Sequence, residues 1–248
     1  MRLCIVLADP RLALNERPRR PSQLDINEQM RVEDALLGLG RDAARALGAT
    51  VVALAVGGRR ARSVARHALT AGVTEVIRVP VDDLGAWPDA DAAALIASLI
   101  RHVGCDLALI GAEGVGGWDR LAGLVAGQAE MAVCTSMLTL VNGEELIAEH
   151  ELEHERVRLA HSRPLVSTVA RTLLASAPCF GYGDVVRSAG RPVATLDPSD
   201  VGIAPPGNRA QRLVFSRLED APRRREITED ADGVDAAVHF LQVIGALR

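Results

Sequence analysis

The chain has 248 residues, of which 48% are hydrophobic and 2% aromatic, and 28 basic residues against 32 acidic ones give a formal charge of −4. All 28 basic residues are arginine, so the sequence contains no lysine. Without an ε-amino group, Schiff-base chemistry and a lysine-dependent P-loop are excluded. The near-neutral charge and the few aromatic residues argue against nucleic-acid binding, which needs a basic surface with stacking rings.

The apolar runs and the cysteines indicate the setting of the chain. No apolar run approaches the ~20 residues of a membrane helix, and the run at residues 3–8 is followed at once by Asp9, unlike a signal peptide. The cysteines form no CxxC pair, which favours reduced thiols over disulfides or a zinc site; they are Cys4, Cys105, Cys134 and Cys179. We therefore expect a cytoplasmic protein with no membrane insertion and no metal site.

The first two thirds of the chain alternate between short apolar runs and segments of helical periodicity. The predicted strands are residues 3–8, 50–56, 75–79, 107–110 and 165–169, and the predicted helices are residues 28–47, 59–71 and 91–103. Glycines follow all three helices, as expected for C-caps. This alternation is typical of βαβ units, so we predict an α/β fold: an open, mostly parallel, Rossmann-like sheet with helices on both faces.

After residue 136 the pattern changes twice. Residues 137–140, a turn at Asn142 and Gly143, and residues 144–159 predict antiparallel strands appended to the sheet. From residue 188 the chain is rich in proline, glycine and charge and ends in an amphipathic helix over residues 234–247. We therefore divide the chain into a core, 1–187, and a C-terminal arm, 188–248, whose helix either wraps a partner or packs on its own core.

Residues 150–154 read H-E-L-E-H and fit the zinc-protease pattern H-E-x-x-H. That chemistry needs His150 and His154 on one face of a helix. Apolar and charged residues alternate here, which predicts a strand, with a bulge after Glu155 to explain a change of phase. On a strand the two histidines would lie roughly 13 Å apart, too far to share a metal. A solvated, charged strand is favoured over a zinc site.

Two glycine-rich turns follow predicted strands and are the candidate ligand sites. Gly57 and Gly58 precede a helix that begins with two arginines, and a helix N-terminus can bind phosphate. Residues 111–123 follow the fourth predicted strand without the GxGxxG spacing. Either turn could equally be a tight βα connection that needs glycine for its dihedral angles. Both lie where ligands collect in open α/β sheets, which indicates nucleotide binding.

No catalytic constellation is evident. The sequence has no G-x-S-x-G elbow, and its serines and histidines lack motif context. The residues considered were Ser136, Ser162, Ser167, His67, His102, His161 and His239.

A collinear set of segments carries a family resemblance. The segments are residues 2–8; D-I-N-E at 25–28 before V-E-D-A-L at 32–36; V-A-L-A-V-G at 52–57; R-H-A-L-T-A-G-V at 66–73; D-L-A-L-I-G at 106–111; and R-P-L-V-S-T-V at 163–169. In this order they resemble the β subunit of electron-transfer flavoproteins over essentially the whole chain.

The resemblance implies an electron carrier without catalytic residues of its own, because the flavin carries the chemistry. It implies a heterodimer with an α subunit that holds most of the FAD, an AMP or second FAD on the β subunit, a dehydrogenase as electron donor, and an arm that wraps the partner. The residues that it places at the cofactor are Val6, Asp25, Val56, Gly57, Gly111, Ala112, Glu113, Gly116, Gly117, Asp119, Arg120 and Gly123.

Two departures from the family pattern bear on cofactor and partner. Ala122 stands at the threonine position of the nucleotide loop, which argues against the usual AMP contacts, although glycine amides and Arg120 could hold a phosphate. In the dehydrogenase-recognition loop, Tyr182 replaces the family's leucine and lysines are missing. We therefore expect a docking partner other than an ordinary acyl-CoA dehydrogenase, held by Tyr182, Val185, Val186 and Arg187. The alternatives are a stand-alone adenine-nucleotide-binding domain and a zinc hydrolase.

Overall fold

The structure is a computed structural model that describes residues 1–8, 23–82, 84, 87–115, 118–142, 146–152, 155–178 and 180–204, with the backbone alone for 23–27 and 142. Its elements are β1 (Arg2–Ala8), α1 (Gln23–Leu47), β2 (Thr50–Gly57), α2 (Arg59–Thr70), β3 (Glu75–Pro80), α3 (Asp89–Val103), β4 (Leu107–Ala112), α4 (Trp118–Ala129), β5 (Ala132–Asn142), β6 (Ile147–Leu152), β7 (Glu155–Ala160), β8 (Leu165–Val169), η3 (Arg171–Ala175), α5 (Tyr182–Ser188), β9 (Ala194–Thr195) and η4 (Pro198–Val201).

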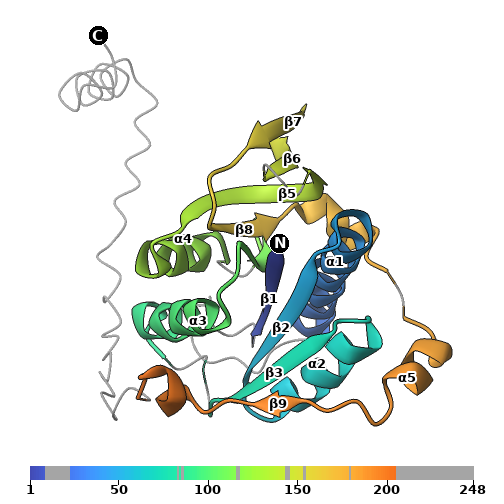
Figure 1. The fold of residues 1–248 in the computed structure, drawn as a ribbon, viewed down its shortest axis with the longest axis vertical. Helices are drawn as coiled ribbons and strands as arrows, with labels where there is room; N and C mark the ends of the chain where they lie inside the picture. Colours follow the sequence, from blue (N-terminus) through green and yellow to red (C-terminus); the bar gives the residue numbers. More distant parts are fainter. Residues whose placement is uncertain are drawn as a thin grey trace, which may run out of the picture. The chain divides into compact units, whose positions relative to one another are not determined.

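Within the described residues, the strands form one nine-stranded sheet in the order β7-β6-β5-β8-β4-β1-β2-β3-β9. Every neighbouring pair from β5 to β9 in this order is parallel, and the pairs β5–β6 and β6–β7 are antiparallel. The helices α1 and α2 cover one face and α3 and α4 the other (Figure 1). The predicted α/β, Rossmann-like fold with appended antiparallel strands is therefore confirmed.

The order of the strands explains this division of the helices. From β1 the chain moves outward to β2 and β3, and it then returns to place β4 on the other side of β1. Right-handed crossovers put helices on opposite faces when the direction of travel reverses. The switch point therefore lies between β1 and β4, where Ala8 and Ala112 end the two strands.

The central strands are buried on both faces, as their unbroken apolar runs predict. In β4 every side chain is buried, and in β1 only Arg2 is partly exposed. The five predicted parallel strands and three predicted helices are all present, with α1 beginning at Gln23 instead of residue 28. Two helices were missed: α4, which begins at Trp118 inside the predicted glycine-rich loop 111–123, and α5, which lies in the predicted recognition loop.

The antiparallel part differs from its prediction in one respect. The change of phase near Glu155 is a chain reversal, not a bulge, because Leu152 at the end of β6 pairs directly with Glu155 at the start of β7. Two residues suffice to join antiparallel strands, so the phase of the alternation restarts after the turn.

The segment after β8 runs back along the helices α1 and α2. It passes through η3 and α5, and then β9 adds a parallel edge strand beside β3. The described residues all lie within one compact unit, Met1–Gly207. The C-terminal helix predicted over residues 234–247 lies outside them. No helix in the described part of the chain is long and apolar enough to span a bilayer.

Candidate functional site

The carboxyl ends of β1, β2 and β4 carry most of the residues that the family resemblance places at a cofactor. Val6 and Val56 point into the core, each 1% exposed, so only their backbone is available to a ligand. Gly57, Gly111 and Ala112 end β2 and β4 at this edge. Asp25 has no described side chain, and Gly116 and Gly117 lie outside the described residues.

Gly111 is required by packing at the end of β4. Its φ is +62°, and a Cβ built there would lie 2.0 Å from Cγ of Trp118. Trp118 is 2% exposed and begins α4. The glycine therefore allows the chain to turn while the indole closes over it, which requires no phosphate at this position.

Asp119 caps the turn that leads into α4. Its Oδ2 accepts a hydrogen bond from the backbone N–H of Gly114 at 2.8 Å, and its Oδ1 accepts one from Oγ1 of Thr168 at 3.3 Å. Glu113 lies beside it, and its pKa is raised by burial, by Asp119 and by Glu151. The side chains of this turn are therefore carboxylates, and the N–H of Gly114 is hydrogen-bonded to Asp119 and not available to a ligand.

The turn after β2 is closed by an ion pair. Glu33, on α1, is 4% exposed and its Oε1 accepts a hydrogen bond from Arg60 at 2.8 Å and from Nε2 of Gln29 at 3.3 Å. Burial raises the pKa of Glu33 although Arg60 and Gln29 oppose the shift. The recess between this pair and the glycines has a volume of about 10 Å³, room for about one water molecule.

The other predicted cofactor residues do not converge on this edge. Arg120 forms an ion pair with Asp89 of α3 at 2.5 Å, and Gly123 lies exposed in the second turn of α4, with no heavy atom within 4 Å of a Cβ built there. Both are on a helix and not in the predicted loop. Among the described residues of this edge, the amide of Gly114 is capped and Arg60 and Arg120 are paired, whereas no side chain caps the first turn of α2.

A second region of interest is the corner where residues 178–191 pack on α1 and α2. A Cβ on Gly38 would meet the Pro178 ring at 2.8 Å, so the chain approaches α1 closely there. The ring of Phe180 stacks edge-on against His67, with centroids 5.3 Å apart. Arg191 donates a hydrogen bond to the carbonyl of Thr74 at 2.9 Å. These contacts fix the segment before and after α5.

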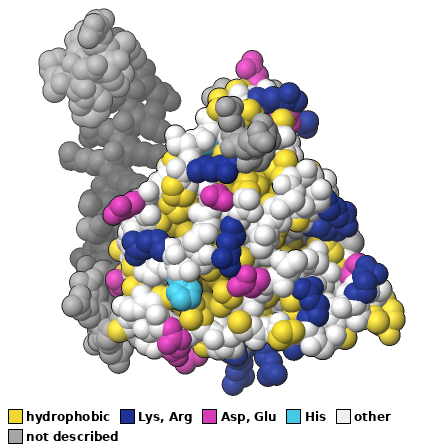
Figure 2. All heavy atoms as spheres, viewed as in Figure 1, with side chains coloured by type: hydrophobic (Ala, Val, Ile, Leu, Met, Phe, Trp, Pro, Cys, Tyr) yellow, Lys and Arg dark blue, Asp and Glu magenta, His cyan; other side chains and the backbone are white. Residues whose placement is uncertain are grey.

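On this anchored segment, α5 exposes an apolar face. Tyr182 is 84% exposed, Val185 50% and Val186 54%; their i, i+3 and i+4 spacing places them on one side of the helix. Arg187 is exposed beside them and pairs with Asp184, whose pKa is lowered by the amide of Gly181 and by Arg187. Figure 2 shows apolar atoms gathered at the corner that α5 occupies in Figure 1. The predicted recognition loop is thus a short helix.

A cavity of about 670 Å³ lies between α1, α2 and α5. No local pattern in the sequence predicts this cavity, because residues from segments more than a hundred positions apart line it. Arg41 and Arg45 of α1 face it, together with Phe180, Arg187 and Arg191 from the later segment. It opens at the amino-terminal edge of β2, where Thr50 begins the strand, and not at the edge with the glycine-rich turns.

The zinc-protease pattern is not supported by the local structure. His150 lies in the strand β6 and not on a helix, and His154 is outside the described residues. The partner of His150 is instead His161, which follows β7; their Nε2 atoms are 2.6 Å apart. Burial and the neighbouring His150 lower the pKa of His161. No sequence motif joins these two histidines, because their contact depends on the β6–β7 hairpin.

Comparison with known proteins identifies the family. The family model for the electron transfer flavoprotein domain matches residues 25–200, and no curated protein sequence matches the chain. The matched residues extend from α1 through β9 and include both the glycine-rich turns and α5. The chain belongs to the electron transfer flavoprotein domain family.

Proposed function

We propose that this chain is the β-type subunit of a heterodimeric electron-transfer flavoprotein and docks an electron-donating dehydrogenase through α5. One observation carries the proposal: Tyr182, Val185 and Val186 form an exposed apolar face on a segment that is fixed at both ends. An exposed aromatic residue with apolar neighbours on a rigid support is the usual form of an interface anchor. Members of the family carry electrons, so the proposed role is transfer and not catalysis.

The flavin belongs mainly to an α-type partner in this proposal. When bound there as FAD, it supplies the electron-carrying chemistry. In the carboxyl-end turns of the present chain, Asp119 caps the amide of Gly114 and Arg60 pairs with Glu33, and AMP is left out of the proposal. The tasks left to this chain are to hold the partner and to present α5 to the donor. The predicted arm contributes only its residues beyond Gly207 to the first task, because β9 already pairs with β3 within the compact unit.

The donor is expected to differ from an ordinary acyl-CoA dehydrogenase. The face of α5 is apolar around one tyrosine, and the basic side chains near it are arginines, Arg187 and Arg191. An arginine binds carboxylates in a fixed planar geometry, unlike a lysine. The partner surface should therefore offer an apolar socket for Tyr182 with acidic residues at its rim.

Cys4, Cys105 and Cys134 are free thiols, in keeping with a reducing compartment such as the cytoplasm.

Co-expression tests the proposal. The chain is produced with the candidate α-type subunit encoded beside its gene, the complex is purified, and its absorption spectrum is recorded. The expected result is a yellow heterodimer that contains FAD. A colourless monomer that retains a nucleotide would contradict the proposal and favour the stand-alone nucleotide-binding domain.

A further inference from the structure

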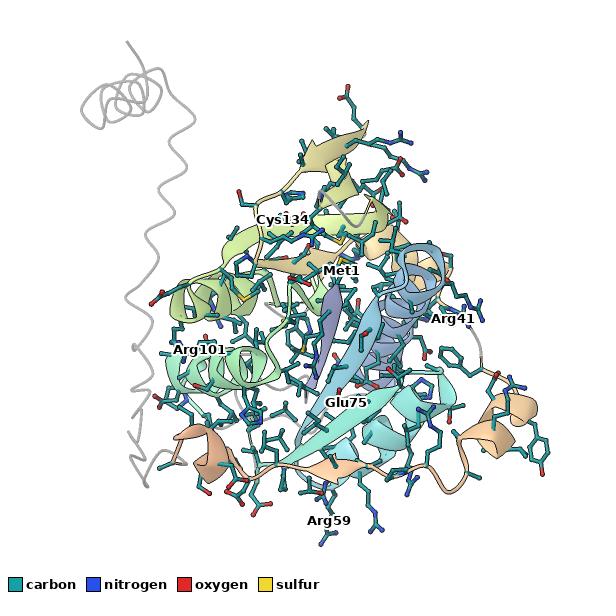
Figure 3. All side chains as sticks on the ribbon, in the orientation of Figure 1. Met1, Arg41, Arg59, Glu75, Arg101 and Cys134 are labelled. Carbon is teal, nitrogen blue, oxygen red and sulfur yellow. The ribbon has the colours of Figure 1, made fainter. Side chains whose placement is uncertain are left out.

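Three potential metal ligands from separate strands meet beside the β6–β7 hairpin. They are Sγ of Cys134 on β5, a ring nitrogen of His150 on β6 and a ring nitrogen of His161 just after β7. These atoms all lie within 4.8 Å of one another. Figure 3 labels Cys134 at this part of the sheet. No step of the proposed electron-transfer role uses any of the three.

The ring of His150 is oriented as a ligand. It is 1% exposed, and its Nδ1 lies 2.8 Å from the backbone carbonyl oxygen of Thr135. A carbonyl only accepts hydrogen bonds, so the proton of the neutral ring is on Nδ1 and the lone pair is on Nε2. This Nε2 points at Nε2 of His161, 2.6 Å away. A hydrogen bond from the second nitrogen to a carbonyl is the usual support of a metal-binding histidine.

The position of Cys134 depends on a bulge in β5. The register between β5 and β8 shifts between Cys134 and Met137, where Ser136 has a φ of +58°. Bulges re-aim side chains in this way. The thiol donates a hydrogen bond to Oγ of Ser167, the residue paired with Cys134 on β8, at 3.2 Å, and it lies within 4.8 Å of the histidine nitrogens.

The three groups are close to the spacing of a tetrahedral zinc site. With Zn–N near 2.05 Å and Zn–S near 2.3 Å, nitrogen ligands lie about 3.3 Å apart, and sulfur lies about 3.6 Å from each nitrogen. The two Nε2 atoms need to separate by about 0.7 Å from the 2.6 Å of their direct contact. The backbone N–H of His161 donates a hydrogen bond to the carbonyl of Leu146 at 2.9 Å, so the separation requires a rotation of the His161 side chain and not a movement of its backbone.

We propose that Cys134, His150 and His161 bind one Zn²⁺ ion, with a water molecule as fourth ligand. Thiolate and imidazole ligands suit Zn²⁺ and exclude the hard cations Mg²⁺ and Ca²⁺. On binding, the thiol of Cys134 releases its proton to solvent and becomes the ligand, with no change of oxidation state. The ion fastens the antiparallel hairpin to the parallel part of the sheet. The site shares only His150 with the H-E-x-x-H pattern and replaces the expectation that the chain has no metal site.

Zinc titration of the metal-stripped, full-length chain against a chromophoric chelator tests the site. We expect one Zn²⁺ per chain, and an affinity at least ~100-fold lower in Cys134→Ser and in His161→Gln, because each removes a ligand. The control Cys105→Ser should retain the affinity within about threefold, since Cys105 is outside the cluster. We expect the same of His154→Gln, which removes the second histidine of the H-E-x-x-H pattern. If His154→Gln abolishes binding and His161→Gln does not, the proposal is wrong.

Cobalt substitution gives a second readout on the wild-type chain, which does not depend on the folding of any variant. One equivalent of Co²⁺ should produce a thiolate-to-cobalt charge-transfer band and the visible bands of a tetrahedral ion. Stoichiometric cobalt without the thiolate band, or less than one equivalent bound, would overturn the proposal and leave a hydrogen-bonded histidine pair. Zn²⁺ should also raise the unfolding temperature of the wild type and leave that of Cys134→Ser unchanged.

Discussion

Two regions of the molecule carry residues that the family resemblance singles out, and they differ in how their side chains are used. At the carboxyl ends of β2 and β4, Asp119 caps the amide of Gly114, and Arg60 pairs with a buried Glu33. At the α5 corner, by contrast, the apolar side chains of Tyr182 and its neighbours have no cover among the described residues. In the first region, Asp119, Glu33 and Arg60 are used in contacts within the chain, whereas the second region leaves an apolar surface for another protein.

The largest effect on stability is expected at the closed edge. Gly111→Ala places a Cβ 2.0 Å from Trp118 Cγ at a φ of +62°, so it should lower the free energy of unfolding by at least about 3 kcal/mol. The control Gly104→Ala has a similar φ, +66°, with open space around it, and should cost only about 1 kcal/mol. Urea unfolding measures both. Equal losses would mean that Trp118 does not close this turn.

The next largest effect concerns binding and not stability. Tyr182→Ala should weaken the complex with the donor dehydrogenase by about 2 kcal/mol, roughly 30-fold in Kd, because it removes the central apolar anchor. Surface plasmon resonance with the purified heterodimer measures this change.

A matched pair of valines controls for exposure in the same binding assay. Val185 on α5 and Val133 on β5 are both 50% exposed. Val185→Ser should reduce binding, whereas Val133→Ser should leave it unchanged. If both variants bind the donor equally well, α5 is not the docking surface.

A smaller effect is expected from the cap of the β4 turn. Asp119→Asn keeps the shape of the side chain but removes the charge on the bond to the Gly114 amide, so stability should fall by about 1 kcal/mol. It also removes a carboxylate close to Glu113.

Calorimetric titration with AMP should show no binding to the wild type. Tight AMP binding that Asp119→Asn abolishes would show that this turn is open to a nucleotide.

The smallest effect is a pH dependence from Glu33. Burial raises the folded-state pKa of Glu33 above its ordinary value of 4.5, so the folded state holds this proton more tightly than the unfolded state does. The contribution of Glu33 to the free energy of unfolding is therefore complete below pH 4.5, and it is lost as the pH rises through the folded-state pKa.

Urea unfolding at several pH values checks this dependence. The difference in stability between the wild type and Glu33→Gln should therefore decline as the pH rises above about 4.5. A difference that grows with pH would show that the pair with Arg60 outweighs the burial.

Elements that depend on interactions between residues close in sequence were predictable, whereas elements that depend on distant contacts were not. The strands β1, β2, β3, β4 and β8 were predictable because each is a short run rich in apolar and β-branched residues between helical or glycine-rich segments. The helix α4 was missed because its first turn follows a run of glycines, and Trp118 is held by packing against Gly111. The β6–β7 reversal was misread as a bulge because both change the phase of an alternating pattern.

The candidate sites were also predictable only where they depend on residues close together in the sequence. The exposed residues of α5 were identified from the sequence, but the helix itself, and the cavity beside it, depend on the packing of residues 178–191 on α1 and α2. The closure of the predicted nucleotide turns was not predictable either. It depends on a glutamate from α1 that meets Arg60 at the start of α2, 27 positions later in the chain.

By itself, the sequence determined the α/β class, the central parallel strands, the exclusion of lysine chemistry and the resemblance to the electron-transfer flavoproteins, since each follows from local periodicity, composition or collinear segments. Only the tertiary structure decided that Cys134, His150 and His161 converge. Strand pairing and a bulge bring together residues 11 to 27 positions apart. Such contacts depend on register, and no short-range pattern in the sequence specifies them.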